Sequence, residues 1–177
     1  MRSLVVRYRA FLLVSVVLLG LSLLDRELGQ QVYDTTAYQL REMILVIPPI
    51  FILLGLLDIW VPKQTMVRFM GEGSGLKGVL LALFIGSAAA GPLYGAFPVA
   101  AVFMKKGVKL SNILIFLGAW STTKIPMLLF EFTALGVPFA LTRLLVNLPG
   151  IIIIAAILEK LMSQKEKDSL YERAQSL

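Results

Sequence analysis

Long apolar runs separated by short polar stretches constrain this chain more than any other feature. A helix needs about 20 residues to cross the hydrocarbon core of a bilayer. Four runs of about that length lie at residues 4–24, 43–61, 112–130 and 135–158. The polar stretches between and after them lie at residues 25–42, 62–78 and 159–177. Since such short stretches cannot bury a core of their own, the sequence predicts an all-α integral membrane protein. We expect a single transmembrane domain over residues 1–158 and a charged tail over residues 159–177.

The residue types exclude several kinds of chemistry. The chain has neither cysteine nor histidine, which removes thiol nucleophiles, disulfides, the usual zinc ligands and a histidine proton relay. We find no paired carboxylates and no nucleophile–base set at usable spacing. We therefore predict that the protein is no enzyme and takes no metal or cofactor. The formal net charge of +6 has no compact basic domain to carry it, so we expect a lipid bilayer and no nucleic acid as partner.

A third kind of segment covers residues 79–104, which are apolar but interrupted at Gly91, Pro92 and Pro98. Proline removes a backbone hydrogen bond from a helix. At membrane depth, non-helical backbone survives only inside protein or beside a wet cavity. The interruption therefore predicts a buried site. Tyr94 lies in this turn and is either an aromatic plug or a binding hydroxyl.

The basic residues decide between two topologies for this segment, since Lys and Arg near span ends mark the cytoplasmic side. If the segment crosses the membrane, the basic residues divide almost evenly between the two sides. If it turns near Gly91 and returns, only Arg26 and Arg41 lie opposite the N-terminus. We favour four transmembrane helices plus one re-entrant or broken helical hairpin, with five straight-through spans as the alternative. Both termini are then cytoplasmic in a multi-pass protein of the cell (inner or plasma) membrane.

Charged side chains inside two predicted spans need an explanation, because each costs about 2.5–3.5 kcal/mol on insertion scales. Lys124 either snorkels to the interface or shares a helix face with Trp120, Ser121 and Glu131. Arg143 lies one turn from Asn147. Its guanidinium can pair with Asp58 or Glu131, as a structural ion pair or as part of a substrate pathway.

Hydroxyl groups and a proline lie next to Lys124. Ser121, Thr122 and Thr123 precede Pro126. Such hydroxyls either satisfy the carbonyls that a proline frees or bind a small polar substrate or ion beside a broken helix. The first half of the stretch 62–78 is a candidate interfacial helix, with Val61, Met66, Phe69 and Met70 facing lipid.

Three motifs resemble a known family. They are Gly91-Pro-Leu-Tyr-Gly-Ala-Phe-Pro98, the basic pair Lys105-Lys106 with Gly107, and Gly118-Ala-Trp leading to Lys124-Ile-Pro126. Over residues 79–147 this pattern resembles the predicted permeases related to the organoarsenical efflux permeases. Members are often longer and consist of two related halves, which implies a half-length member that works as a homo-oligomer or with a second half-permease chain. The efflux relatives tend to carry a cysteine near the break. Its absence here makes a thiol-seeking substrate doubtful.

These observations give a functional hypothesis and an alternative. The hypothesis is a permease subunit that moves a small solute or ion by alternating access. Its expected substrate pathway consists of Gly91, Pro92, Tyr94, Pro98, Ser121, Thr122, Thr123, Lys124, Pro126, Glu131, Arg143 and Asn147. The alternative is a non-transporting membrane subunit of a larger complex, in which the small residues from Gly86 to Gly91 form a helix-packing surface.

Overall fold

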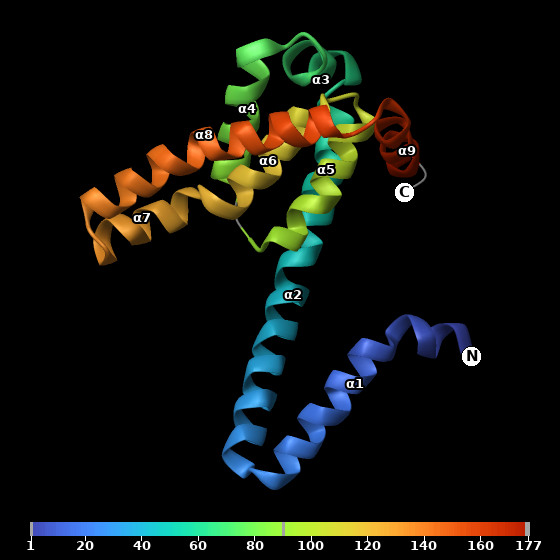
Figure 1. Ribbon diagram of the computed structural model, residues 1–177, viewed down its shortest axis with the longest axis vertical. Coiled ribbons are helices and arrows are strands. Elements are labelled where there is room, and N and C mark those ends of the chain that lie inside the picture. Colours follow the sequence, from blue (N-terminus) through green and yellow to red (C-terminus); the bar gives the residue numbers. More distant parts are fainter. Residues whose placement is uncertain (1, 90, 176–177) are drawn as a thin grey trace. The chain divides into compact units, whose positions relative to one another are not determined.

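The chain is helical, without a strand, in every part that the structure describes (Figure 1). The computed structural model describes residues 2–89 and 91–175, without the side chains of residues 2–7, 54, 57 and 58. The α-helices are α1 (Arg2–Leu24), α2 (Arg26–Trp60), α3 (Lys63–Met70), α4 (Gly75–Ala88), α5 (Ala96–Lys105), α6 (Leu110–Thr122), α7 (Ile125–Ala134), α8 (Val137–Leu161) and α9 (Gln164–Gln175). A short 3-10 helix, η1 (Leu93–Gly95), precedes α5. The all-α fold predicted from the sequence is confirmed.

Several helices are long and apolar enough to cross a membrane. Among the described residues they are Arg26–Leu53 in α2, Leu110–Ala134 across α6 and α7, and Val137–Leu161, which is α8. The pair α3 and α4, bent by 110° at its break, is a fourth candidate. The described apolar part of α1, Tyr8–Leu24, is a shorter helix. The helix that contains the predicted span 43–61 begins earlier than its apolar run, because the polar residues from Arg26 onward are helical as well.

The chain divides into two compact units, Met1–Pro48 and Pro49–Leu177. The boundary falls inside α2 between two successive prolines, where the helix lacks two backbone donors. In the first unit, Asp25 separates α1 from α2. Its Oδ1 accepts hydrogen bonds from the backbone N–H groups of Glu27 (2.9 Å) and Leu28 (3.1 Å), which is the geometry of a helix N-cap.

The core of the second unit forms where α4 and α8 pack against α6. Three aromatic rings lie at its centre. The ring centroids of Phe103 and Phe116 are 5.0 Å apart, and those of Phe116 and Trp120 are 5.5 Å apart, both edge to face. This arrangement is favoured by the aromatic quadrupole. The contact between Phe103 and Phe116 joins α5 to the middle of α6.

Small residues bring α4 and α6 close together. A Cβ atom added to Gly86 would lie 2.5 Å from the carbonyl oxygen of Phe116 and 2.8 Å from the Cβ of Ala119. Close backbone approach through small residues is the usual way in which helices pack in lipid. At Gly86, this surface is used inside the chain.

Helix α3 packs against α4 instead of presenting its methionines to lipid. Met66 and Met70 are 7% and 1% exposed, so the prediction that they face lipid is wrong. The two residues are one helical turn apart and share a face. The 110° bend between α3 and α4 turns that face onto the core.

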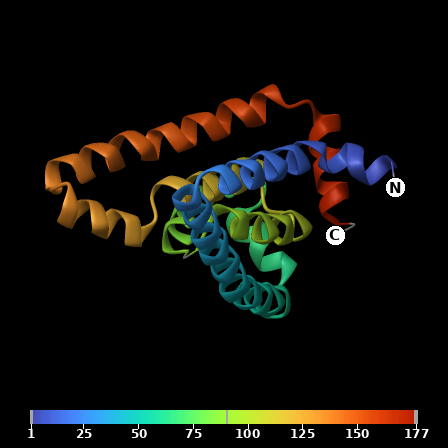
Figure 2. The same cartoon turned by 90° about the horizontal axis from the view of Figure 1, so that it is seen from below.

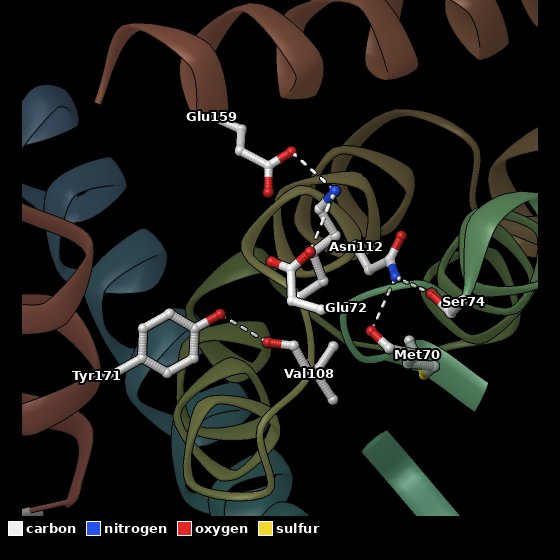
Figure 3. Close-up of polar contacts among 8 residues, drawn as sticks. Met70, Glu72, Ser74, Val108, Asn112, Glu159 and Tyr171 are labelled. Carbon is white, nitrogen blue, oxygen red and sulfur yellow. Dashed lines mark hydrogen bonds and ion pairs between the residues drawn. The ribbon is translucent and has the colours of Figure 1, made fainter. Parts of the chain in front are cut away.

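Residues 79–104 fold back on themselves, which is the path expected for the favoured hairpin topology. Helix α4 leads into the interruption, and α5 leads back (Figure 1). The two ends are joined, because the backbone N–H of Lys109 donates to the carbonyl of Met70 at 2.9 Å. The buried Asn112 side chain also donates from Nδ2 to the Met70 carbonyl (2.8 Å) and to Ser74 Oγ (3.1 Å) (Figure 3). The segment therefore enters and leaves at the same end of the unit.

The last two predicted spans form a second helical hairpin. The predicted span 112–130 consists of α6 and α7, separated after Thr122, and α8 corresponds to the predicted span 135–158. Helices α7 and α8 contact each other and diverge from the turn that joins them (Figures 1 and 2). Gly136, with φ +86°, forms the turn between them. The charged tail contains α9.

Candidate functional site

The first part of the site is the interruption between α4 and η1. Gly91 has φ +102°, a backbone conformation that residues with a side chain rarely adopt. Pro92 follows in an extended conformation and begins η1. The backbone therefore leaves the helical path here, and the Gly91 carbonyl is free to accept hydrogen bonds from another element.

The second part is the interruption between α6 and α7. Thr123 and Lys124 cap the two helices, and Lys124 has extended ψ (135°). Pro126 lies in the first turn of α7. Because proline has no N–H, it cannot donate to the carbonyl of Thr122 four residues earlier. The interruption thus leaves a free carbonyl oxygen in the middle of an apolar stretch.

The two interruptions face each other. The Gly91 carbonyl oxygen accepts hydrogen bonds from Trp120 Nε1 (3.3 Å) and from Lys124 Nζ. Ser87 Oγ lies 2.8 Å from Thr123 Oγ1. Thr123 already donates its hydroxyl proton to the Ala119 carbonyl (3.1 Å), so Ser87 is the donor of the pair. Lys124 therefore finds its partner inside the protein.

An ion pair supports the second interruption from α8. Arg143 Nη1 is paired with Glu131 Oε1, and Arg143 Nη2 donates to the carbonyl of Thr122 at 2.8 Å. That carbonyl is the one freed by Pro126. Of the two acids expected to pair with Arg143, the structure selects Glu131; the side chain of Asp58 lies outside the described residues. Since Lys124 contacts Gly91 while Glu131 contacts Arg143, the expected single polar face of Lys124 and Glu131 is wrong: it assumed a continuous helix.

The hydroxyls before Pro126 bond mainly to their own helix. Ser121 Oγ and Thr122 Oγ1 both donate to the Gly118 carbonyl, at 3.0 Å and 2.8 Å. Side chains of this kind satisfy backbone carbonyls near a helix end. Only Thr123 also contacts the facing interruption, through Ser87.

Three predicted pathway residues lie away from these contacts. Tyr94 is 41% exposed. Pro98 lines an open apolar cavity together with Phe51 and Lys105. Asn147 is half-buried on α8. The structure therefore brings Gly91, Thr123 and Lys124 together directly, but it does not bring these three residues to the same contact.

Sequence reasoning missed two residues of the contact. Ser87 is the only hydroxyl in the small-residue run Gly86-Ser-Ala-Ala-Ala90, and its isolation in that run was an available signal. The sequence pattern places Trp120 beside Lys124 on a helix face, but the predicted substrate pathway does not include Trp120. Its indole N–H needs an acceptor when buried, and the Gly91 carbonyl provides one.

A polar cluster closes the base of the first hairpin. Lys109 Nζ lies 3.6 Å from a Glu72 carboxylate oxygen and 3.4 Å from one of Glu159. In α9, the Tyr171 hydroxyl donates to the Val108 carbonyl at 2.6 Å (Figure 3). Burial, aided by the nearby negative charges of Glu72 and Glu159, raises the pKa of Tyr171 to about 12. The charged tail is therefore docked on the hairpin through a protonated phenol.

Tail docking is expected to weaken at high pH. The pKa of Tyr171 is raised from 10.0 to about 12 in the folded protein. The contribution of its hydrogen bond to stability is therefore complete below about pH 10 and is lost as the pH rises toward 12. In an ultraviolet titration of the five tyrosines, the last phenol to ionise should disappear in Tyr171→Phe. The exposed Tyr33 provides the control: if Tyr33→Phe removes the same late step, the assignment to Tyr171 is wrong.

Together, the apolar helices and the polar contacts between two interrupted helices define a multi-pass α-helical membrane protein with a polar centre. The sequence model of the ArsP_1 family, described as a predicted permease, matches residues 29–176. The chain therefore belongs to this family of predicted permeases. The match includes both interruptions. No curated protein and no solved structure matches the chain. Membership in a permease family indicates a role in membrane transport rather than in enzymatic catalysis.

Proposed function

We propose that the chain is a permease subunit that moves a small solute or ion across the bilayer by alternating access around its two facing helix interruptions. The observation that carries this proposal is the Gly91 carbonyl, which receives both Trp120 Nε1 and Lys124 Nζ from the other interruption. Interrupted helices with polar groups are a recurring way of building transport sites in membranes.

The contacts between the interruptions are suited to opening and closing. They consist of two hydrogen bonds to the Gly91 carbonyl and one between the hydroxyls of Ser87 and Thr123. A solute with polar oxygen atoms can replace the Gly91 carbonyl as acceptor for Lys124. Each exchange then trades one hydrogen bond for another, so the opposing conformations remain close in free energy.

We assign the predicted pathway residues according to where they lie. Gly91, Thr123 and Lys124 take part in the closed contact, and Pro92 follows Gly91 in the first interruption. Pro126 frees the carbonyl on which Arg143 rests, and Glu131 holds Arg143 in place. Of the remaining pathway residues, Ser121 and Thr122 directly precede the contact in the sequence, whereas Tyr94, Pro98 and Asn147 lie away from it.

An exposed polar group next to the first interruption favours a second chain. Tyr94 is 41% exposed, and a polar group that faces lipid is costly. We propose that another copy of this chain, or a second half-permease, covers it. The basic residues at the hairpin base, Lys105, Lys106 and Lys109, support placing that base in the cytoplasm, together with α9, which is docked on it through Tyr171. A cysteine introduced at Tyr94 tests the homo-oligomer, because disulfide formation in this cysteine-free chain requires a second copy.

Substitution of Lys124 tests the transport site. In liposomes, the purified protein should give solute-induced currents or counterflow with at least one compound from a panel of small anions, cations and neutral polar solutes. Lys124→Met should reduce that flux about tenfold or more, because a charge-assisted hydrogen bond is worth about 1.5–3 kcal/mol. Lys77→Met, at an exposed lysine, should leave the flux unchanged.

Two results would contradict the proposal. One is an unchanged flux in a normally folded Lys124→Met protein, which would exclude the assigned site. The other is the absence of flux by the chain alone combined with stable co-purification of a larger membrane complex. The second result would favour a non-transporting subunit.

Alternating access can also be tested without a known solute. Ser121 is exposed at the end of α6, and the chain contains no cysteine that could react in its place. A membrane-impermeant maleimide should label Ser121→Cys from either side of the membrane in oriented vesicles. Labelling from one side only would contradict alternating access at this position.

A further inference from the structure

One buried acid in the second unit has an oxygen atom without a partner. Glu131 is 3% exposed, and its Oε2 is buried without a hydrogen bond, whereas Oε1 is paired with Arg143. Buried polar atoms in proteins nearly always have a partner. An unpaired carboxylate oxygen within an apolar helix pair therefore points to a group that binds there.

The surroundings of Glu131 contain a single opposing charge. Helix α8 packs against α7 and contributes Arg143. The other charged residues of α8, Glu159 and Lys160, lie at its opposite end. Helix α6 carries no charged residue, and Lys124 is engaged by the Gly91 carbonyl. Within the described residues, Arg143 is thus the one charged group that these helices place against Glu131.

The number of available ligands favours a proton over a metal ion. Metal cations such as Ca²⁺ and Mg²⁺ require about six oxygen ligands. Among the described residues, no group of three or more acidic side chains could hold a metal ion. A proton needs only one oxygen atom, and Glu131 Oε2 supplies it.

We propose that Glu131 is a proton-binding site and that its occupancy controls how firmly Arg143 holds the interruption between α6 and α7. When a proton from water binds Oε2, the carboxylate becomes a neutral acid. The ion pair with Arg143 is then replaced by a weaker hydrogen bond between a cation and a neutral oxygen. Arg143 keeps its positive charge and retains only the Thr122 carbonyl as a strong partner.

This change reaches the transport contact through consecutive residues. Arg143 Nη2 donates to the carbonyl of Thr122. The next two residues, Thr123 and Lys124, contact Ser87 and Gly91. Loosening Arg143 therefore loosens the segment that closes the site. The control of the transport contact by Glu131 rests on the proposed permease function. Proton binding by Glu131 does not depend on that function.

Infrared difference spectroscopy tests proton binding directly. Purified wild-type protein in lipid, taken from about pH 8 to about pH 3 so that the ordinary pKa of glutamate is passed, should gain the C=O stretching band of a buried carboxylic acid, sensitive to exchange into D₂O. Glu131→Gln should lose that band, whereas Glu159→Gln should retain it. Glu131→Asp keeps a carboxyl group and should shift the band. This variant allows the assignment to be tested even if Glu131→Gln does not fold. The absence of the band in wild type, or its persistence in Glu131→Gln, would overturn the proposal.

Tryptophan fluorescence tests the link to the interruption. The chain has two tryptophans, so Trp60→Phe leaves Trp120, whose indole N–H contacts Gly91. Acidification over the same range should change the Trp120 emission in Trp60→Phe. The double variant Trp60→Phe/Glu131→Gln should show the acid spectrum at both pH values. An emission that is independent of pH in Trp60→Phe would overturn the control of the interruption by Glu131.

The proton site and the permease function can be refuted separately. If the infrared band is present but no solute is transported by the wild-type protein, the permease function fails and the proton site stands. If solute flux is observed without the band, the proton site fails and the permease function stands.

Discussion

Arg143→Met is expected to destabilise the protein by about 3–5 kcal/mol, which is the usual cost of leaving one member of a buried ion pair without its partner. The Glu131 carboxylate would lose its only cation, and the Thr122 carbonyl, freed by Pro126, would lose its donor. Methionine has a similar length and is apolar, so the loss of packing is small. The effect can be measured as a decrease in unfolding free energy in mixed micelles, or in melting temperature in detergent.

The double variant Glu131→Gln/Arg143→Met separates charge from packing. If the uncompensated carboxylate causes the loss, neutralising it should recover most of the stability, because a buried ion pair and a neutral replacement often differ little in free energy. Arg68→Met removes an exposed guanidinium near the Phe69 ring and should change stability by less than about 0.5 kcal/mol. Equal destabilisation of the single and double variants would show that Arg143 acts through packing.

The partner of Arg143 could be predicted from the sequence, but its contact with Thr122 could not. Charges inside apolar spans require partners, and that rule alone reduced the candidates to Asp58 and Glu131. The second role of Arg143, as donor to Thr122, depends on a carbonyl freed by a proline on another helix. Its identification required the position of the helix interruption, which residue spacing within one helix does not define.

The hairpin of residues 79–104 and the tail helix α9 also differ in how far the sequence predicts them. The return of residues 79–104 was predictable, because it follows from the distribution of basic residues and from the interruption at Gly91 and Pro92. The docking of α9 was not. It depends on one hydrogen bond from Tyr171 to Val108 and on Lys109 between Glu72 and Glu159. These are contacts between distant residues, and the polar sequence of the tail contains no pattern that identifies its binding surface.

Gly91→Ala is expected to abolish most of the transport activity while the protein still folds. The backbone of Gly91 has φ +102°, where a side chain introduces about 1–3 kcal/mol of strain. The substitution keeps the carbonyl group but favours a different backbone angle, so the oxygen moves away from Trp120 Nε1 and Lys124 Nζ. We therefore expect a loss of flux larger than the loss of stability suggests, and a change in Trp120 emission in the Trp60→Phe background.

Gly150→Ala is the matched control for this prediction. Gly150 lies within α8 with no atom within 4 Å of an added Cβ. Alanine at such a helical position should be neutral or stabilise the protein by about 0.5–1 kcal/mol. Flux should therefore be retained in Gly150→Ala and lost in Gly91→Ala. If Gly91→Ala transports normally although its Trp120 emission is altered, the contact between the interruptions is structural, and the pathway must be sought elsewhere on the chain.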